Sequence, residues 1–389
     1  MTSMHIGGAE RALIGLLHAF DYGRVQVDLF LNRHEGELMA DIPQDVNLLP
    51  ENPKYKSLAE PIQLTVKRGQ IAIAAGRLLG KLVARIKENG VHRDSGIYGE
   101  YSHKYTKWLM PNVNPDVEYD LAISFITPHY FVAEKVKAKR RIAWIHTDYS
   151  QIALDVPSQL KMWSVYDNIA SISNEVTRAF LGVFPTLKDR IILIENILPE
   201  KLIRKQANER YQDCPCTKYN LLTIGRFSFQ KRLEDIPAIC SALVSKGLDV
   251  CWNIIGYGDT EKMIKENIVK CQMEGHVHIL GKKDNPYPYI KACDLYVQPS
   301  RYEGKAVTVR EAQMLDRPVV ITDFPTAHSQ LEDGVDGIIV PMDMQSCAKA
   351  IANLLTHPEN MKALSENCKR LEYSNKDEVQ KLYELIGVE

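Results

Sequence analysis

Short apolar runs, each followed by a turn and a helical pattern, constrain the fold of this chain most strongly. Three such runs lie in the first half of the sequence, at residues 25–31, 120–125 and 141–146. The second half has six, at residues 220–225, 250–256, 277–281, 294–298, 318–322 and 337–340. Short apolar strands that alternate with helices indicate βαβ units and parallel sheets. The sequence therefore predicts an α/β fold with two Rossmann-like halves.

The length agrees with this prediction, because 389 residues is long for one compact core and suits two domains. Residues 197–218 are polar and contain proline, which is typical of a linker. We therefore predict an N-terminal Rossmann-like lobe over residues 1–197 and a C-terminal lobe over residues 198–389. We leave open whether the last helix packs back on the N-terminal lobe. A ligand cleft is expected beyond the carboxyl ends of the strands.

The first eleven residues resemble the end of a strand that runs directly into a glycine turn, Gly7-Gly8, and a helix over 9–19. We expect the apolar beginning of that strand to lie upstream of Met1, so that the first strand is truncated in this sequence. The two glycines allow a phosphate or an acceptor to approach the backbone closely. A tight strand-to-helix turn explains them equally well.

Composition excludes several classes of protein. Lys and Arg together number 48 and Asp and Glu 49, so a general attraction to nucleic acid is not expected. No run of eighteen apolar residues and no secretory signal is present, which favours a cytoplasmic protein. The cysteines all follow residue 213, and the close pair Cys214 and Cys216 matches neither a zinc site nor a thioredoxin-like motif. We expect reduced, unreactive thiols.

Two glutamates, Glu303 and Glu311, are the most informative polar residues. A buried strand is predicted before them, ending at Ser300, and a helix after them, through residues 312–315. Glu303 is therefore expected on the loop and Glu311 one to two turns into the helix. A strand, a turn and a helix N-terminus form an anion site, since backbone N–H groups and the helix dipole point outward there. Carboxylates beside such a site indicate recognition of hydroxyl groups on a phosphate-bearing ligand, as in a nucleotide sugar.

Two further turns follow predicted strands of the second half. Arg226 and Lys231 lie five apart across one of them, where both could direct a cation at a single diphosphate. The alternative is a solvated basic turn. Gly256 and Gly258 form a Gly-x-Gly that lacks the third glycine of a dinucleotide fingerprint. Close packing against a nucleotide and an ordinary turn are equally compatible with it.

The first half supplies two more candidates. His146 follows the strand over 141–145 and could donate a hydrogen bond to a sugar or its scissile oxygen, unless it is only a surface histidine. A basic amphipathic helix is expected over residues 67–87, with Arg77, Lys81 and Arg85 on one face and leucines on another. Contact with an anionic membrane surface or an anionic acceptor, and packing on its own lobe with a solvated basic face, remain open alternatives.

Several motifs are absent from the sequence. It contains no Asp-x-Asp pair, no zinc spacing, no Gly-x-Ser-x-Gly elbow and no Walker A loop. We therefore expect a site without a metal ion.

Together these residues resemble the family-4 retaining glycosyltransferases (glycosyl transferases group 1) with the two-lobed GT-B fold. The resemblance rests on segments 7–11, 225–231, 256–258 and 303–312, whose order and separations match along nearly the whole chain. It implies that Arg226 and Lys231 hold the donor diphosphate and that Glu311 binds the ribose hydroxyls. Glu303 would contact the donor sugar, which His146 would also touch.

The resemblance further implies that Gly7, Gly8, Gly256 and Gly258 line the binding site. The backbone amides after Gly304, at Lys305, Ala306 and Val307, would cradle sugar and phosphate. Lys305 and Ala306 stand where many members carry an aromatic residue and a glycine, so the identity of the donor sugar stays open.

The implied activity is metal-independent transfer, with retention, from a nucleotide-diphosphate sugar to an acceptor hydroxyl. We expect a UDP-sugar as donor substrate, no separate cofactor, and a glycan or lipid-linked acceptor in bacterial cell-envelope or extracellular polysaccharide synthesis. The protein would be cytoplasmic, with peripheral attachment to the inner face of the membrane left open. The alternatives are a GT-B-type sugar-nucleotide epimerase and an inactive partner subunit of a glycosyltransferase complex. The intact set of Glu303, Glu311, Arg226 and Lys231 argues against the inactive subunit.

Overall fold

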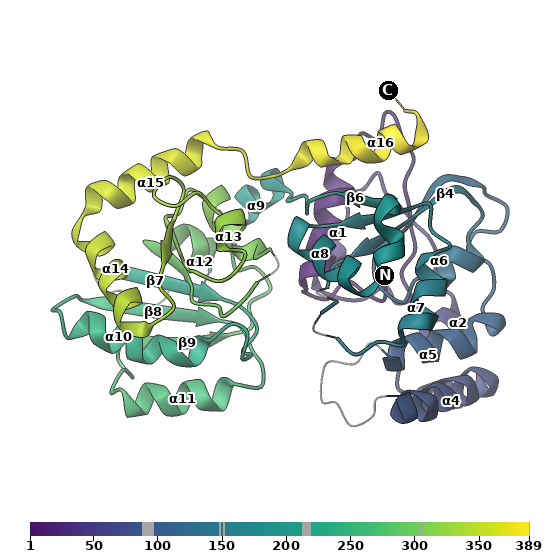
Figure 1. Ribbon diagram of the computed structural model, residues 1–389, viewed down its shortest axis with the longest axis horizontal. Helices are drawn as coiled ribbons and strands as arrows, with labels where there is room; N and C mark the ends of the chain where they lie inside the picture. Colours follow the sequence, from purple (N-terminus) through teal and green to yellow (C-terminus); the bar gives the residue numbers. More distant parts are fainter. Residues whose placement is uncertain (88–96, 148, 151, 212–218, 304, 389) are drawn as a thin grey trace. The chain divides into compact units, whose positions relative to one another are not determined.

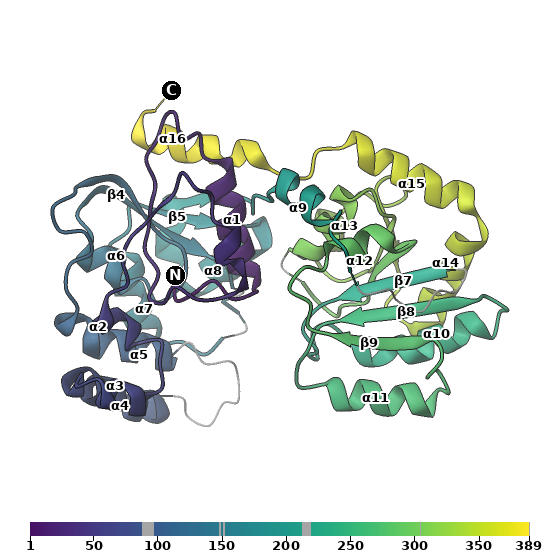
Figure 2. The same cartoon turned by 180° about the vertical axis from the view of Figure 1, so that it is seen from behind.

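The computed structural model describes residues 1–87, 97–147, 149–150, 152–211, 219–303 and 305–388. The chain forms two compact units, each with parallel strands and packed helices (Figures 1 and 2). Unit 1 comprises Met1–Leu198 and Asn375–Glu389, and unit 2 comprises Pro199–Ser374. The predicted α/β class is confirmed.

Unit 2 contains one six-stranded parallel sheet in the order β12-β11-β10-β7-β8-β9. Its strands are β7 (Tyr219–Ile224), β8 (Val250–Ile255), β9 (Val277–Gly281), β10 (Leu295–Gln298), β11 (Val319–Thr322) and β12 (Ile338–Val340). The first strand in sequence, β7, is central, with β8 and β9 on one side and β10, β11 and β12 on the other. This is the doubly wound arrangement, and all six predicted strands are present.

Helices cover this sheet because its strands are apolar on both faces. Trp252 of β8 is fully buried, and its indole N–H donates to the Thr223 hydroxyl at 3.0 Å. One hydrophobic cluster joins the strands to α10, α11 and α14. The helical elements of unit 2 are α9 (Glu200–Gln206), η4 (Leu233–Asp235), α10 (Ile236–Val244), α11 (Glu261–Lys270), α12 (Tyr287–Ala292), α13 (Val307–Met314), η5 (Ala327–Ser329), α14 (Met344–Thr356) and α15 (Pro358–Arg370).

Unit 1 divides its strands between two parallel sheets. A pair consists of β1 (Asp28–Leu29) and β2 (Asn47–Leu48), and a four-stranded sheet has the order β3-β4-β5-β6. The four strands are β3 (Tyr119–Ser124), β4 (Ala138–Ile145), β5 (Asn168–Ser171) and β6 (Ile191–Leu193). The strand predicted over 25–31 is reduced to two residues, because β1 forms its ladder with β2 alone among the described residues. The strands β2, β5 and β6 were not predicted.

The C-terminal segment belongs to unit 1 and contacts residues near both ends of the Met1–Leu198 segment. The Asp21 N–H donates to the Tyr383 hydroxyl at 2.7 Å, and the Lys381 ammonium donates to the Leu193 carbonyl at 2.8 Å. The helical elements of unit 1 are α1 (Gly8–Ala19), η1 (Glu37–Asp41), α2 (Pro53–Lys56), α3 (Ile62–Lys67), α4 (Ile71–Lys87), α5 (Ile97–Thr106), η2 (Lys107–Leu109), α6 (Tyr130–Lys135), α7 (Val156–Trp163), α8 (Asn174–Val183), η3 (Pro185–Arg190), η6 (Lys376–Val379) and α16 (Gln380–Ile386). None of the helices in the described ranges is long and apolar enough to cross a bilayer.

The segment predicted as a linker contains a helix, α9, whose Ile203 is fully buried. Residues 212–218 of that segment, with Cys214 and Cys216, lie outside the described residues. The other six cysteines are free thiols.

The basic helix predicted over residues 67–87 begins later, at Ile71, as α4; the preceding helix α3 ends at Lys67, and Gly69 with φ +74° lies between them. Arg77 was expected on a solvated basic face, and this is wrong. Its side chain is buried, and Nη1 donates to the carbonyls of Ser57 at 2.6 Å and Glu60 at 2.7 Å. These carbonyls offset the cost of burying the guanidinium.

The leucines of α4 are also misplaced by the prediction. In the alternative in which this helix packs on its own lobe, they would form the buried face. Small residues face α5 instead: a Cβ added to Gly80 would lie 2.8 Å from the Ser102 nitrogen, so the helices approach closely there. The leucine side chains point to solvent, and Leu78, Leu79 and Leu82 are about half exposed, whereas Ile73 is buried. Burial of an arginine and exposure of leucines reverse the usual amphipathic arrangement.

Candidate functional site

The carboxyl ends of β7 and β10 lie side by side in unit 2. These strands are neighbours in the sheet, yet the chain leaves β7 toward β8 and leaves β10 toward β11. Such a switch point is where open parallel sheets bind ligands. The loop after β7 carries Arg226 and Lys231, and the loop after β10 carries Glu303.

The structure brings Lys231 and Glu303 into contact. The lysine ammonium lies 2.6 Å from Glu303 Oε1, and the two side chains are 17% and 6% exposed. Gly225 makes room for the lysine, because a Cβ at that position would lie 3.3 Å from Lys231 Cδ. A glycine at the end of β7 thus lets the aliphatic part of Lys231 lie flat while its charge reaches the adjoining loop.

Further donors fix the Glu303 carboxylate. The Ser300 hydroxyl donates to Oε1 at 2.5 Å, and the Gln298 amide donates to the same oxygen at 3.4 Å. The Gln230 amide donates to Oε2 at 3.3 Å. Gln298 was not predicted as a site residue, although a fully buried glutamine at the end of an apolar strand could have indicated one. This carboxylate is well suited to accept hydrogen bonds in a fixed orientation.

Glu311 lies in the second turn of α13, as predicted, but it is only 1% exposed. The Tyr287 hydroxyl of α12 donates to its Oε1 at 2.9 Å. Both glutamates lie near Tyr296 of β10. Burial raises the pKa of Tyr296, and the negative charges of Glu311 and Glu303 add to this effect. The two carboxylates therefore flank one buried strand end.

Some backbone groups at the start of α13 already have hydrogen-bond partners within the protein. Ala306 is the N-cap residue, and its N–H donates to the Gln330 side-chain oxygen at 2.8 Å. The Glu303 carbonyl accepts from the Thr326 hydroxyl at 2.7 Å. Lys305 has an interaction of its own, and Val307 is the first helical residue. Gly304 lies outside the described residues.

Arg226 is exposed, and within the described ranges it has no hydrogen bond or ion pair. The neighbouring cation Arg301 is engaged instead: its guanidinium lies 4.0 Å from the centre of the Phe229 ring and 2.7 Å from Glu234 Oε1. Of these two arginines, Arg226 is therefore the one available to an anion at this sheet edge.

Gly256 and Gly258 have a packing role. Their φ angles are +149° and +150°, and added Cβ atoms would lie 1.9 Å from the Gly225 carbonyl oxygen and 2.4 Å from that of Phe227. The Phe227 N–H also donates to the Tyr257 carbonyl at 2.8 Å. Glycine is required at both positions, because the loops after β7 and β8 pack backbone to backbone.

The remaining predicted residues belong to unit 1. Gly7 is the N-cap of α1, and a Cβ there would lie 2.2 Å from Glu10 Oε2, so an acidic side chain already covers this helix start. Burial raises the pKa of Glu10. An added Cβ on Gly8 would meet nothing within 4 Å.

His146 follows β4 and is largely buried. Burial lowers its pKa to about 4, so the imidazole is neutral at pH 7. Its ring centre lies 4.5 Å from that of Phe125. In the described structure Nε2 is buried and has no hydrogen-bond partner. An unsatisfied polar nitrogen at a strand's carboxyl end is compatible with the predicted contact to a ligand hydroxyl.

The matching family profile covers the unit that holds these charges. Residues 205–371 match the family "Glycosyl transferases group 1". This range takes in the strands β7 to β12 and all four charged residues of the switch point.

Characterised and uncharacterised relatives agree with that match. Alpha-D-kanosaminyltransferase of Streptomyces kanamyceticus is 29% identical over 196 residues, 48% of this chain and 50% of its own length. The uncharacterized glycosyltransferase MJ1178 of Methanocaldococcus jannaschii is 25% identical over 326 residues, 76% and 88% of the two chains. The amylovoran biosynthesis glycosyltransferase AmsK of Erwinia amylovora is 28% identical over 167 residues, 41% and 39%. The similarity thus spans about half of the kanosaminyltransferase and less of AmsK.

Among solved structures, Anabaena HepE in complex with UDP-glucose is similar over 100% of this chain and 98% of its own, with a TM-score of 0.64 and 16% identity. At this identity the likeness concerns the fold, which is GT-B as predicted.

Proposed function

We propose that this chain, which belongs to the group 1 glycosyltransferases and has the GT-B fold, transfers a sugar from a nucleotide-diphosphate donor to an acceptor hydroxyl. The observation that carries the proposal is the polar constellation at the unit 2 switch point. There Lys231 is paired with Glu303 at 2.6 Å, and the exposed Arg226 stands at the end of the neighbouring strand.

The first role is stabilisation of the leaving group. Arg226 and Lys231 both follow β7, so one diphosphate at this edge could meet a guanidinium fork and an ammonium. Fixed positive charges stabilise the charge that develops on a departing diphosphate. The proposed reaction therefore needs no metal ion, because the two side chains supply the positive charge.

The second role is orientation of the donor. The Glu303 carboxylate is bound by Lys231, Ser300 and Gln230, and we assign it to accept hydrogen bonds from sugar hydroxyls and not to attack the anomeric carbon. Glu311 would bind the ribose hydroxyls and share its carboxylate with Tyr287. The predicted sugar contact of His146 rests on its neutral imidazole.

The proposed chemistry retains the anomeric configuration. The acceptor oxygen forms its bond to the anomeric carbon on the face from which the phosphate oxygen departs. The acceptor's proton passes to that phosphate oxygen, so no protein base is required. We take a UDP-sugar as the first donor to test, since HepE, of the same fold, was solved with UDP-glucose.

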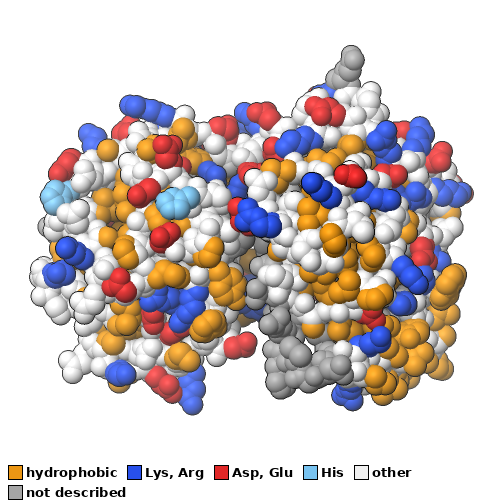
Figure 3. Space-filling model, viewed as in Figure 1, with side chains coloured by type: hydrophobic (Ala, Val, Ile, Leu, Met, Phe, Trp, Pro, Cys, Tyr) orange, Lys and Arg blue, Asp and Glu red, His pale blue; other side chains and the backbone are white. Residues whose placement is uncertain are grey.

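A growing polysaccharide is the proposed acceptor class. Support comes from AmsK, whose name assigns it to amylovoran biosynthesis. We further propose that a lipid-linked acceptor is met at a membrane surface through α3 and α4. The exposed apolar side chains there are Leu64, Val66, Ile71, Leu78, Leu79, Leu82 and Ile86. Figure 3 shows hydrophobic side chains gathered where Figure 1 places α4.

Charge supports this choice of surface. Lys81, Arg85 and Lys87 are exposed on the same helix as the leucines. Apolar side chains can enter the headgroup region while neighbouring cations attract anionic lipid. This arrangement favours peripheral attachment through one face of unit 1.

The central experiment measures binding and turnover separately. A panel of nucleotide sugars is screened for a rise in Tm and for hydrolysis, and the best donor is then used with Arg226→Ala. We expect kcat to fall by about a hundredfold or more, because a donor to the developing charge is lost. The matched control is Lys262→Ala, which removes a cation whose side chain is 88% exposed on α11. Undiminished turnover in Arg226→Ala would refute the assignment.

The same screen distinguishes the alternatives. Interconversion of one nucleotide sugar into another without any acceptor would favour an epimerase. A protein whose Tm no nucleotide raises would favour an inactive partner subunit.

A further inference from the structure

Phe229, on the loop after β7 in unit 2, is an exposed aromatic residue that the structure holds in place. It is 66% exposed. The guanidinium of Arg301 lies over the ring, 4.0 Å from its centre. Because one face is covered and two thirds of the residue is still exposed, the other face of the ring is open to a ligand.

Arg301 is itself fixed by hydrogen bonds. Its Nη1 donates to the Phe229 carbonyl at 2.5 Å and to Glu234 Oε1 at 2.7 Å, and the Glu234 side chain is only 9% exposed. The Arg301 backbone N–H donates to the Gln230 carbonyl at 2.8 Å. A cation held in this way keeps its aromatic partner in one orientation. A ring that is already ordered loses little freedom when a ligand packs on it.

The loop that carries Phe229 is joined to the charged pair of the site. The Gln230 amide donates to the Tyr302 carbonyl at 3.0 Å and to Glu303 Oε2 at 3.3 Å. Lys231, two residues after the ring, contacts Glu303 at 2.6 Å. The ring therefore has a fixed position beside the Glu303 carboxylate.

The helices of unit 2 place Glu311 and Phe229 toward opposite faces of the sheet. Figures 1 and 2 show α12 and α13 on one face and α10 and α11 on the other. Glu311 of α13 contacts Tyr287 of α12. Glu234, which binds the same arginine as the ring, accepts through its carbonyl from Asn267 of α11 at 2.8 Å.

This placement indicates which part of a ligand lies near the ring. In the proposed function Glu311 binds the ribose, Lys231 the diphosphate and Glu303 the sugar. The donor would therefore run from the α12–α13 face, with its sugar nearest to Phe229 and its base farthest away. The hydroxyl that attacks this sugar must come from a molecule close to it.

The chemistry of the open ring face favours a sugar as that neighbour. A pyranose with equatorial hydroxyls has flat C–H faces, and an aromatic face is apolar with a negative quadrupole that attracts such C–H groups. The hydroxyls at the edge of the pyranose remain available for hydrogen bonds.

From these observations we propose that Phe229 is a stacking platform for a pyranose ring of the acceptor glycan. The proposal rests on the proposed function for the direction of the donor. Phe229 would contact the acceptor directly. Arg301 would be a positioning residue, because it acts on the acceptor only through the aromatic ring.

The test measures binding of methyl β-D-glucopyranoside to the complete chain by saturation-transfer NMR titration. We expect Phe229→Ala to raise Kd by about tenfold, since one stacked ring is lost. Phe229→Tyr should keep Kd within about twofold, because it preserves the ring face. The matched control is Met263→Ala, which truncates another exposed apolar side chain, on α11. Saturation should be strongest on the C–H protons of one face of the pyranose.

A double-mutant cycle tests the positioning role. Arg301→Met should raise Kd by about threefold in the parent protein and leave it unchanged in the Phe229→Ala background, since the two residues act as a unit. An equal effect of Arg301→Met in both backgrounds would overturn the positioning role.

Equal Kd values for the parent protein and Phe229→Ala, or no measurable binding to the parent protein, would overturn the platform. Weaker binding of uridine to Phe229→Ala, with the glucoside unaffected, would show a nucleobase platform and overturn it as well.

The rise in Tm with UDP tests the proposed function separately, because it depends on the donor site. No rise with UDP, together with glucoside binding that depends on Phe229, would contradict the donor site and support a sugar platform. A rise with UDP, together with glucoside binding that is independent of Phe229, would overturn the platform alone.

Discussion

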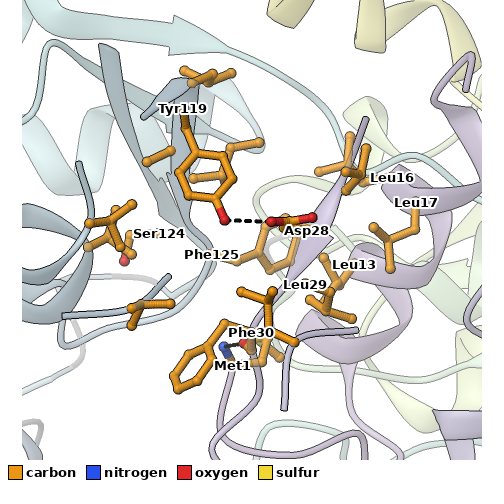
Figure 4. A pocket seen from close by; sticks show the side chains of 18 of the residues that line it. Met1, Leu13, Leu16, Leu17, Asp28, Leu29, Phe30, Tyr119, Ser124 and Phe125 are labelled. Carbon is orange, nitrogen blue, oxygen red and sulfur yellow. Dashed lines mark hydrogen bonds between the residues drawn. The ribbon is translucent and has the colours of Figure 1, made fainter. Parts of the chain in front are cut away.

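The two units differ in the continuity of their sheets. In unit 2, β7 lies inside a sheet that is continuous across six strands. In unit 1 an apolar cavity is lined by residues of β1 and β3 (Figure 4), and the described strands are divided into a pair and a group of four. Parallel strands therefore form one continuous sheet with a charged switch point in unit 2, whereas the described strands of unit 1 form two separate sheets.

This difference shows that the contact between Lys231 and Glu303 depends on direct pairing of the strands that precede them. Lys231 reaches Glu303 because β7 and β10 are paired directly, with Leu221 opposite Leu295 and Leu222 opposite Tyr296. In unit 1, β1 and β3 have no such ladder in the described residues, and side chains such as Tyr119 and Asp28 make the connection.

The largest expected effect concerns the paired charges of unit 2. Replacing Lys231 with Met should reduce kcat by about 10²–10³-fold, because one of two cations for the diphosphate is lost. Glu303→Gln should also reduce kcat, and the double variant should lose less than the sum of both, since the residues act as a unit. Steady-state kinetics of the four proteins test this. Strict additivity would show that the ion pair has no role in turnover.

The second prediction concerns the backbone beneath that site. Gly256→Ala should destabilise the protein by about 3 kcal/mol, because a Cβ would meet the Gly225 carbonyl and the residue has a φ of +149°. Thermal unfolding measures the effect. Gly275→Ala is the control, since an added Cβ there meets nothing within 4 Å. Equal Tm values for the two variants would contradict the close packing of these loops.

The third prediction separates the units by acid. Burial lowers the pKa of His103 and of His129 to about 3, and that of His146 to about 4, and all three lie in unit 1. The unfolded chain takes up these protons below pH 6.5, whereas the folded unit does not. The stability that these neutral histidines contribute is therefore fully present above pH 6.5 and is lost as the pH falls toward 3–4.

At pH 5 each such histidine should cost about 2 kcal/mol. The free energy of unfolding of the parent protein should fall between pH 7 and pH 5, and His103→Phe should reduce that fall by about 2 kcal/mol. Urea unfolding followed by fluorescence suits this test, because Trp108, Trp144 and Trp163 all lie in unit 1. His328→Phe is the surface control. If both variants lose as much stability as the parent protein, the buried histidine is not responsible.

The smallest expected effect concerns the exposed face of unit 1. Leu79→Ser combined with Leu82→Ser should weaken binding to phosphatidylglycerol vesicles by about tenfold, because two apolar side chains no longer enter the lipid. Cosedimentation measures binding. Val269→Ser, on an exposed position of α11 in unit 2, is the matched control. An equal loss of vesicle binding in both variants would show that α4 does not make the membrane contact.

The strands of unit 2 could be predicted because each is a short apolar run bounded by a turn, a pattern that depends on neighbouring residues alone. The strands β5 and β6 were missed, and β1 was predicted too long, because their extent depends on the partners they find. Gln298 and Tyr287 were not recognised as partners of the glutamates, since they come from β10 and α12 and reach them only through packing.

Prediction of the helix over 67–87 fails for a similar reason. Periodicity gave Arg77 a solvated face, but the carbonyls of Ser57 and Glu60 provide a buried site for it. No pattern within the helix indicates that neighbouring loop.

By itself the sequence determined the α/β class, the strands of unit 2 and the placement of Arg226, Lys231, Glu303 and Glu311 after strands or within the following helix, because these follow from local periodicity and turn chemistry. Only the tertiary structure decided that Lys231 meets Glu303, that Gly256 packs on Gly225, and that the leucines of α4 face solvent. Each of these joins residues distant in sequence, and packing selects such contacts.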